Sequence, residues 1–286
     1  MSRIVYLNGS YAPLEEAKVS VMDRGFLFAD GIYEVSAVVS GKLVDNEAHL
    51  ARLERSLSEI GIAMPLSFAD FVRVEEELIR RNALDNGLVY IQVTRGAAER
   101  EFTYAPGLKP TVVMFTQARD AINNPIAHSG LKIITLPDIR WARRDIKSVA
   151  LLAQVLAKQA AREKGADEAW MVEGGFVTEG GSSNAFIVTR GGAIITRPLS
   201  NDILPGITRL AVLALAKERG FAIEERAFSV HEALGAAEAF LTSATSFVLP
   251  VIEIDGKPVA DGKPGPVTQR LREIYIDMAR GQRKAS

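Results

Sequence analysis

One lysine of this sequence stands where its positive charge would be disfavoured. Lys147 lies in the segment RRDIKS at positions 143–148, and Ser148 is a candidate N-cap for a helix. The positive end of that helix and the two neighbouring arginines would disfavour the ammonium form of the lysine. A neutral lysine can act as a base or form a Schiff base with an aldehyde. The alternative is an ordinary surface cation.

A carboxylate with small neighbours is the second candidate. Glu179 lies in the segment VTEGGSSN at positions 177–184, between two expected strands. Its glycine and serine neighbours leave room for a flat ligand or another backbone to come close. The alternative is a solvated turn.

Two further segments offer groups that can hold an anion. Gly206, Ile207 and Thr208 follow a proline at the start of an expected helix, where free amides and a hydroxyl group face outwards. Residues 242–246 (TSATS) supply more hydroxyls and amides directly after an expected strand. Most helix starts bind only water, and the second segment alone is typical of a polar loop. Together with Lys147, these segments form a set able to hold an anion and to supply a reactive amine.

Length and composition narrow the class of protein. The chain has 286 residues, of which 48% are hydrophobic and 24% charged, and these values are typical of a globular protein rather than a disordered one. With 34 basic and 35 acidic residues, the net charge is -1. Such a chain has no overall field to gather nucleic acid or anionic lipid. The absence of cysteine excludes disulfides, a thiolate nucleophile and zinc–cysteine sites.

The sequence lacks the motifs that are typical of several other classes of protein. No apolar run approaches the roughly 18 residues needed to cross a membrane, and the N-terminal segment lacks the apolar core of a signal peptide. We therefore expect a cytoplasmic protein that acts on a small molecule, with no membrane or nucleic-acid partner. The sequence has no glycine-rich dinucleotide motif, no nucleophile elbow and no complete phosphate loop. The histidines lack metal-ligand spacing, so no metal site is predicted.

The hydrophobic pattern predicts two α+β domains with mixed, mostly antiparallel sheets. We expect a small N-terminal domain over 1–118, a linker over 119–130 and a larger C-terminal domain over 131–286. Asn8-Gly9 indicates a hairpin in the first domain, and Ser67 is a candidate N-cap. Helices are expected over 47–60, from 68 to about 78, over 148–165, 208–220 and 267–278, mostly from apolar residues at helical spacing.

Seven short stretches, taken in order, resemble the pyridoxal-phosphate aminotransferases of fold type IV. Any one of them is weak evidence, but their order along nearly the whole chain is specific. Within that family, the resemblance is to the enzymes that act on D-amino acids. The stretches are residues 28–34 (FADGIYE), 46–53 (NEAHLARL), 92–96 (QVTRG), 138–141 (DIRW), 145–148 (DIKS), 177–180 (VTEG) and 206–209 (GITR).

The resemblance assigns a role to each candidate residue. It implies that Lys147 holds pyridoxal phosphate covalently and moves a proton during the reaction, and that Glu179 keeps the pyridine nitrogen of the cofactor protonated. It implies that Leu204 packs on one face of the cofactor ring, and that Tyr33 and Arg100 hold the substrate carboxylate. The residues expected around the phosphate are Arg52, Ile207, Thr208, Ser243 and Ala244.

The resemblance also implies the reaction and the partners. We expect a homodimer that moves the amino group of a D-amino acid, such as D-alanine or D-glutamate, to a 2-oxo acid in two half-reactions. This sequence has Phe102, Ala37 and Ala150 where the D-amino-acid enzymes that it resembles carry histidine, lysine and asparagine. The first two differences favour a more apolar pocket. A branched-chain L-amino-acid or (R)-amine transaminase therefore stays open, as does a non-catalytic binding protein that keeps the fold.

Overall fold

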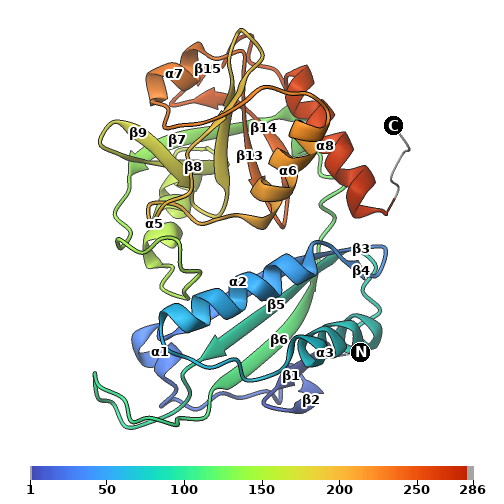
Figure 1. Ribbon diagram of the computed structural model, residues 1–286, viewed down its shortest axis with the longest axis vertical. Helices are drawn as coiled ribbons and strands as arrows, with labels where there is room; N and C mark the ends of the chain where they lie inside the picture. The colour runs from blue at the N-terminus through green and yellow to red at the C-terminus, as the bar shows by residue number, and fades with distance from the viewer. Residues whose placement is uncertain (1, 282–286) are drawn as a thin grey trace. The chain divides into compact units, whose positions relative to one another are not determined.

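The computed structural model describes residues 2–281 (Figure 1). Internal contacts divide the chain into two compact units. The first unit runs to Asp120 and also contains Ile146–Ala150, and the second consists of Ala121–Asp145 and the described chain from Leu151 onward. The short segment that carries Lys147 therefore belongs with the first unit, whereas we expected it among residues 131–286.

In the described part of the chain, the first unit is built on a six-stranded antiparallel sheet in the order β2-β1-β6-β5-β3-β4. The turn expected at Asn8-Gly9 joins β1 to β2, with φ angles of 50° and 100°. Positive φ at both residues matches the right-handed twist of the paired strands. The strands are β1 (Ile4–Leu7), β2 (Ser10–Pro13), β3 (Gly31–Val39), β4 (Lys42–Leu43), β5 (Gly87–Thr94) and β6 (Thr111–Ala118).

Two amphipathic helices, α2 (Asn46–Glu59) and α3 (Phe68–Arg81), pack on one face of this sheet. Ser67 caps α3 as expected, because its hydroxyl accepts a hydrogen bond from the Asp70 amide at 3.1 Å. A short helix, α1 (Arg24–Phe28), precedes β3. The core joins apolar side chains at helical spacing to alternate strand residues, which point to one face: Leu50, Leu53, Leu57, Phe71 and Leu78 with Ile32, Ile91, Val93 and Met114.

A carboxyl group buried in this core is held in its neutral form. Glu75 of α3 is fully buried, and its Oε2 accepts a hydrogen bond from Asn46 Nδ2 at 2.6 Å. Its Oε1 has no partner among the described residues. Burial raises the pKa of Glu75 to about 8, and the nearby charge of Glu34 adds to this rise against the lowering effect of Asn46. Glu75 therefore keeps its proton at neutral pH.

Replacing Glu75 with glutamine is expected to stabilise the protein at high pH and to change little at pH 5. In the unfolded chain the carboxyl group of Glu75 has its ordinary pKa of 4.5, whereas its pKa in the folded protein is about 8. Between about pH 4.5 and 8 only the folded state keeps the proton, so the stability of the folded protein falls as the pH rises through this window. We expect Glu75→Gln to be about 2–4 kcal/mol more stable than the wild type at pH 9, since one pKa unit corresponds to about 1.4 kcal/mol. Urea unfolding at pH 5 and pH 9 measures both differences, and an equal difference at the two values would contradict a buried neutral acid.

The described part of the second unit contains a mixed nine-stranded sheet. Its order is β12-β11-β10-β13-β14-β7-β8-β9, with β15 paired to β14. The pairs β14–β7, β7–β8 and β11–β12 are parallel and the others antiparallel, so the expected α+β class with mostly antiparallel sheets is confirmed. The strands are β7 (Leu131–Pro137), β8 (Glu168–Glu173), β9 (Phe176–Gly180), β10 (Asn184–Val188), β11 (Ile194–Thr196), β12 (Ile223–Glu225), β13 (Glu238–Ser243), β14 (Phe247–Ile254) and β15 (Lys257–Pro258).

The helices of this unit differ from expectation at three places, one of which is the short helix over Val230–Gly235 that was not predicted. The expected N-cap Ser148 is wrong, because α5 begins only at Leu152 and Ser148 lies in an extended segment bridged to Ile32 of β3. A short helix also lies within the expected linker 119–130, where Pro125 has the φ of −60° that a helix start requires. No helix within residues 2–281 is both long and apolar enough to cross a membrane. The helices are α4 (Ile126–Ser129), α5 (Leu152–Glu163), α6 (Ile207–Glu218), α7 (Val230–Gly235) and α8 (Pro266–Ala279).

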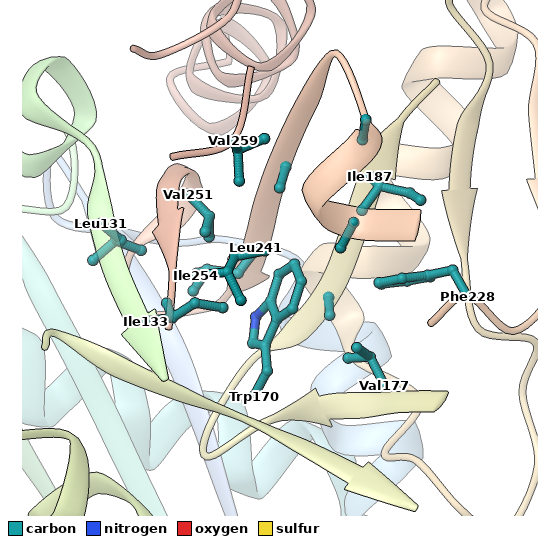
Figure 2. Close-up of a cluster of buried hydrophobic side chains, with 14 of the residues drawn as sticks. Leu131, Ile133, Trp170, Val177, Ile187, Phe228, Leu241, Val251, Ile254 and Val259 are labelled. Carbon is teal, nitrogen blue, oxygen red and sulfur yellow. The ribbon is translucent and has the colours of Figure 1, made fainter. Parts of the chain in front are cut away.

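Figure 2 shows the core of the second unit, where Trp170 of β8 lies among aliphatic side chains from several strands. Trp170 is fully buried, and its ring meets that of Phe228 edge to face at 5.9 Å. Phe186 of β10 stacks on its cross-strand partner Phe240 of β13 at 4.6 Å. Large buried rings contribute much of the hydrophobic stabilisation of a core. They make β8, β10 and β13 a firm support for the polar residues at the ends of these strands.

Candidate active site

Lys147 lies in an extended segment beside the start of β3. The backbone amide of Tyr33 donates to the carbonyl oxygen of Lys147 at 3.0 Å. The backbone amide of Val149 donates to the carbonyl oxygen of Gly31, also at 3.0 Å. These bonds fix the backbone of Lys147 against the sheet of the first unit. Because α5 begins at Leu152, Lys147 is not at a helix start, and the expectation that a helix dipole acts on it is wrong.

The side chain of Lys147 meets an aromatic ring. Its Nζ lies 4.1 Å from the centre of the Tyr33 ring, a distance at which the ring face attracts the amine as a cation. Tyr33 stacks in turn on Tyr90 at 5.6 Å, and Tyr90 stacks on Phe115 at 4.7 Å. Three rings from β3, β5 and β6 therefore form a row that holds Tyr33 in place under the amine. Burial raises the pKa of Tyr90 above its ordinary value, so its hydroxyl stays neutral and donates to Gln92 at 2.8 Å.

The side chain of Arg52 is held by the buried carboxylate of Glu34, the residue that follows Tyr33 in β3. Glu34 has no exposed surface and accepts from Arg52 Nε at 2.7 Å and from Arg52 Nη2 at 2.8 Å. Its Oε2 also lies 2.8 Å from His49 Nδ1. Burial alone would raise the pKa of Glu34, but Arg52 and His49 outweigh it and hold the pKa well below the ordinary value. Glu34 is therefore charged at neutral pH, and its two hydrogen bonds fix the orientation of the Arg52 guanidinium.

Arg100 lies on the loop between β5 and β6, and its side chain is exposed. Its guanidinium lies 5.5 Å from the centre of the Phe28 ring and 6.0 Å from that of Phe102, and these two rings lie 5.5 Å apart. Arg24 anchors the backbone of this loop, since its Nη1 donates to the Glu101 carbonyl oxygen at 2.6 Å. Arg100 is thus an exposed cation on a loop whose backbone is tied down, and it can take a substrate anion.

Glu179 is fully buried and oriented by three neighbours in the second unit. Arg140 Nη1 donates to its Oε1, Asn184 Nδ2 donates to its Oε2 at 2.9 Å, and the amide of Leu204 lies 3.1 Å from both oxygens. Burial raises the pKa of Glu179, and Arg140 and the Leu204 amide offset only part of this rise. The side chain of Glu179 is therefore fixed in one orientation, and a protonated ring nitrogen beside it would favour its charged form.

Arg140 is in turn oriented by Asp138. Arg140 Nε and Nη2 donate to the two oxygens of Asp138 at 3.0 and 2.6 Å. Thr178 Oγ1 donates to Asp138 Oδ2 at 2.7 Å. Burial would raise the pKa of Asp138, but Arg140 and Thr178 lower it below the ordinary value. Arg144 Nη1 also lies 3.5 Å from Asp138 Oδ2, so two guanidinium groups lie beside these two acidic side chains.

Two of the segments expected to bind an anion meet at Asn184. Gly206 is the N-cap of α6, and a Cβ at Gly206 would collide with Asn184 Oδ1, so only glycine allows α6 to start this close to β10. Asn184 also pairs across the sheet with Thr242 at the end of β13. The hydroxyl groups of Thr208 and Thr242 are both buried and have no partner among the described residues. Buried hydroxyls without a partner are costly, and a bound anion would satisfy them.

Comparison with known proteins identifies the family. The model of the family "Amino-transferase class IV" matches residues 31–254. The chain belongs to this family. The aminotransferase is 41% identical over 274 residues to the D-alanine aminotransferase of Staphylococcus aureus strain MSSA476, an alignment that covers 95% of this chain and 96% of that protein.

Solved structures have the same fold as this aminotransferase. The branched-chain amino acid aminotransferase of Escherichia coli is 23% identical, with a TM-score of 0.92 over 100% of this chain and 97% of that one. The branched-chain amino acid aminotransferase of T.th., solved with pyridoxamine 5'-phosphate, is 26% identical, with a TM-score of 0.91 over 99% and 96% of the two chains. The protein is an enzyme that transfers amino groups and uses pyridoxal phosphate, as class IV aminotransferases do.

The residues of this aminotransferase fit that cofactor. Lys147 supplies a primary amine, Glu179 a buried carboxyl group, and the buried hydroxyls of Thr208 and Thr242 lack a partner among the described residues and could donate to a phosphate. In the first unit, Tyr33 and Glu34 lie at the start of β3, with Lys147 beside them. Arg52 lies on helix α2 and is paired with Glu34. The expected residues Glu179, Leu204, Ile207, Thr208, Ser243 and Ala244 all belong to the second unit.

Sequence reasoning missed four residues that hold these groups. Glu34, Asp138 and Arg140 lie inside stretches that carry the family resemblance, and Asn184 lies just beyond one of them. No function was assigned to them, because a single charged residue in a strand gives no sign of its partner. The available signal was the apolar setting of Glu34, since an acidic residue in a strand that is otherwise buried must be paired.

Proposed function

We propose that this aminotransferase moves the amino group of a D-amino acid, such as D-alanine or D-glutamate, to a 2-oxo acid in two half-reactions. The observation that carries the proposal is the 41% identity to a D-alanine aminotransferase over nearly the whole of both chains. Arg100 supports it, because an exposed guanidinium on a tethered loop suits a substrate carboxylate.

The proposal assigns the chemistry to two residues. When bound, pyridoxal phosphate supplies an electron sink for the carbanion that forms at the substrate Cα. Lys147 would hold the cofactor covalently, and its amine, once freed, would carry the proton between the substrate Cα and the cofactor. Glu179 keeps the pyridine nitrogen protonated, since the charge of a carboxylate favours the pyridinium form.

The remaining residues bind and orient. Arg52, fixed by Glu34, supplies positive charge to the phosphate, and Leu204 packs on one face of the cofactor ring. Tyr33 and Arg100 hold the substrate carboxylate. The phosphate also receives hydrogen bonds from the amides or hydroxyls of Ile207, Thr208, Ser243 and Ala244.

The proposal also includes a homodimer. Leu152, Val155 and Leu156 of α5 are 71%, 59% and 53% exposed and lie on one helix face. Such a row is typical of a surface that a partner covers, and in a homodimer this partner is a second copy of the chain. Sedimentation velocity at micromolar concentration measures the mass of the assembly, and a mass of 31.0 kDa would rule out a stable dimer.

A substrate comparison with an Arg100 variant tests the proposed specificity. With pyruvate or 2-oxoglutarate as acceptor, we expect the wild type to use D-alanine or D-glutamate at least about 100-fold more efficiently than L-leucine or (R)-1-phenylethylamine. Arg100→Met should raise KM for the D-amino acid by about 10- to 100-fold, because a charge-assisted fork is lost. It should change kcat/KM for the amine, which has no carboxylate, less than about 3-fold.

The control is Arg73→Met, since Arg73 is 74% exposed and pairs with Asp70 of helix α3. We expect no change in any of these constants for the control. L-Leucine as the best substrate would favour a branched-chain transaminase, and the amine as the best substrate would favour an (R)-amine transaminase. Equal losses for D-amino acid and amine in Arg100→Met would remove Arg100 from carboxylate binding.

A further inference from the structure

Helix α8 holds the loop that follows β13. Residues 244–246 connect β13 to β14, and Arg272 of α8 lies behind them with only 7% of its surface exposed. Arg272 Nη1 donates to the carbonyl oxygens of Ser246 and Val248, both at 2.9 Å. Its Nη2 donates to the carbonyls of Ala121 and Ile122, the latter at 2.9 Å. One buried guanidinium thus ties this loop to the segment before α4.

The exit of the loop has a backbone conformation that needs such support. Phe247 has a φ of 63°, which is rare and unfavourable for a bulky side chain. Its ring is fully buried and lies 5.0 Å from that of Tyr275, one helical turn beyond Arg272 on α8. The same helix therefore holds both the carbonyl groups of the loop and the strained residue that closes it.

The other end of β13 is tied to the same helix. Glu238, the first residue of β13, accepts from the amides of Val267 and Thr268 at 2.9 and 2.8 Å. It also accepts from the hydroxyl of Thr268 at 2.7 Å. These bonds satisfy the free amides at the start of α8. With both ends of β13 attached to α8, Arg272 has a defined position relative to Thr242, Ser243 and Ala244.

We propose that Arg272 is a positioning residue for phosphate recognition. It holds the 243–246 backbone in the one arrangement that presents the Ser243 and Ala244 groups to the phosphate of the cofactor, without touching the phosphate itself. This inference rests on the proposed function, which places the phosphate on that loop. A methionine at 272 fills a similar volume but leaves four carbonyl oxygens without their donor, so the loop gains other conformations.

The test compares pyridoxal phosphate with pyridoxal, which has the same aldehyde but no phosphate. The full-length protein is freed of cofactor, and each compound is titrated by tryptophan fluorescence and by absorbance. The wild type should prefer pyridoxal phosphate. Arg272→Met should weaken its binding by about 10- to 100-fold, the range found when residues behind a ligand-binding group are removed at metal sites. It should change the affinity for pyridoxal less than about 3-fold.

Two further variants keep the test decisive. Arg270→Met is the matched control, because Arg270 lies on the same helix, is 53% exposed and pairs with Glu273; neither affinity should change. Arg272→Lys keeps the charge but cannot reach four carbonyls with one nitrogen, so a smaller loss, about 3- to 10-fold, is expected for pyridoxal phosphate alone. If Arg272→Met does not fold, the lysine variant carries the test.

The outcomes separate the inference from the function on which it rests. Equal losses for both compounds, or an unchanged preference for pyridoxal phosphate in both Arg272 variants, would overturn the role of Arg272. A wild type that binds pyridoxal as tightly as pyridoxal phosphate would instead overturn the assignment of the phosphate to Thr208, Ser243 and Ala244.

Discussion

Lys147→Ala is expected to lower kcat for transamination by at least about 10⁴-fold. The same amine is needed twice, once for covalent attachment of the cofactor and once for proton transfer at the substrate Cα, and losses from such a residue are large. The Tyr33 ring beneath Nζ, 4.1 Å away, cannot replace the amine, because a phenol does not form the covalent link. Steady-state and single-turnover rates with D-alanine and pyruvate measure the loss.

Borohydride reduction fixes the cofactor permanently on the amine that binds it. The position of this label therefore identifies the reactive lysine independently of the rate. Reduction of the wild-type holoenzyme followed by peptide mapping should place the cofactor on Lys147, and Lys147→Ala should carry no label there. Lys132→Ala is the control, because Lys132 is 53% exposed and pairs with Glu253; we expect it to keep its full rate and its label. A label on another lysine, or a near-normal rate for Lys147→Ala, would falsify the assigned role.

Glu179→Gln is expected to lower kcat by about 10²- to 10³-fold, the range seen when one preorganised electrostatic contact is removed from an active site. Glutamine has the same shape and can still accept from Leu204, but it has no charge to keep the pyridine nitrogen protonated. The cofactor should stay bound, because Glu179 is not among the residues proposed for the phosphate. The measurements are kcat for both half-reactions and cofactor content after dialysis.

Glu173→Gln is the matched control for this variant. Glu173 ends the preceding strand β8, is 48% exposed and pairs with the buried Arg144. It is not among the residues proposed to contact cofactor or substrate, so its neutralisation should leave kcat within about 2-fold, since only contacts that differ in the transition state change the rate. Glu179→Asp, which restores the charge on a shorter side chain, should recover part of the rate. If Glu179→Gln turned over as fast as the wild type, the pyridine nitrogen would need another partner, and the role of Glu179 would be withdrawn.

The local elements followed from short-range patterns. The Asn8-Gly9 hairpin, the Ser67 cap and the start of α6 at Gly206 all depend on backbone preferences of neighbouring residues, which act within a few positions. The order of seven motifs was enough to indicate the class IV aminotransferase family and its cofactor. Sequence by itself therefore determined the class of fold, the family and the chemistry to expect of Lys147.

Tertiary structure alone decided which side chains meet. The apolar residues after Lys147 suggested a helix from Ser148, but the bonds between Ile146–Ala150 and β3 keep that segment extended and delay α5 to Leu152. Likewise, nothing local pairs Glu34 with Arg52, holds Glu75 neutral, or places Arg272 behind a loop some 26 residues away. The physical reason is that burial and ion pairing depend on contacts between distant segments, and these long-range terms override local preference wherever a charge or a strand edge must be satisfied inside the fold.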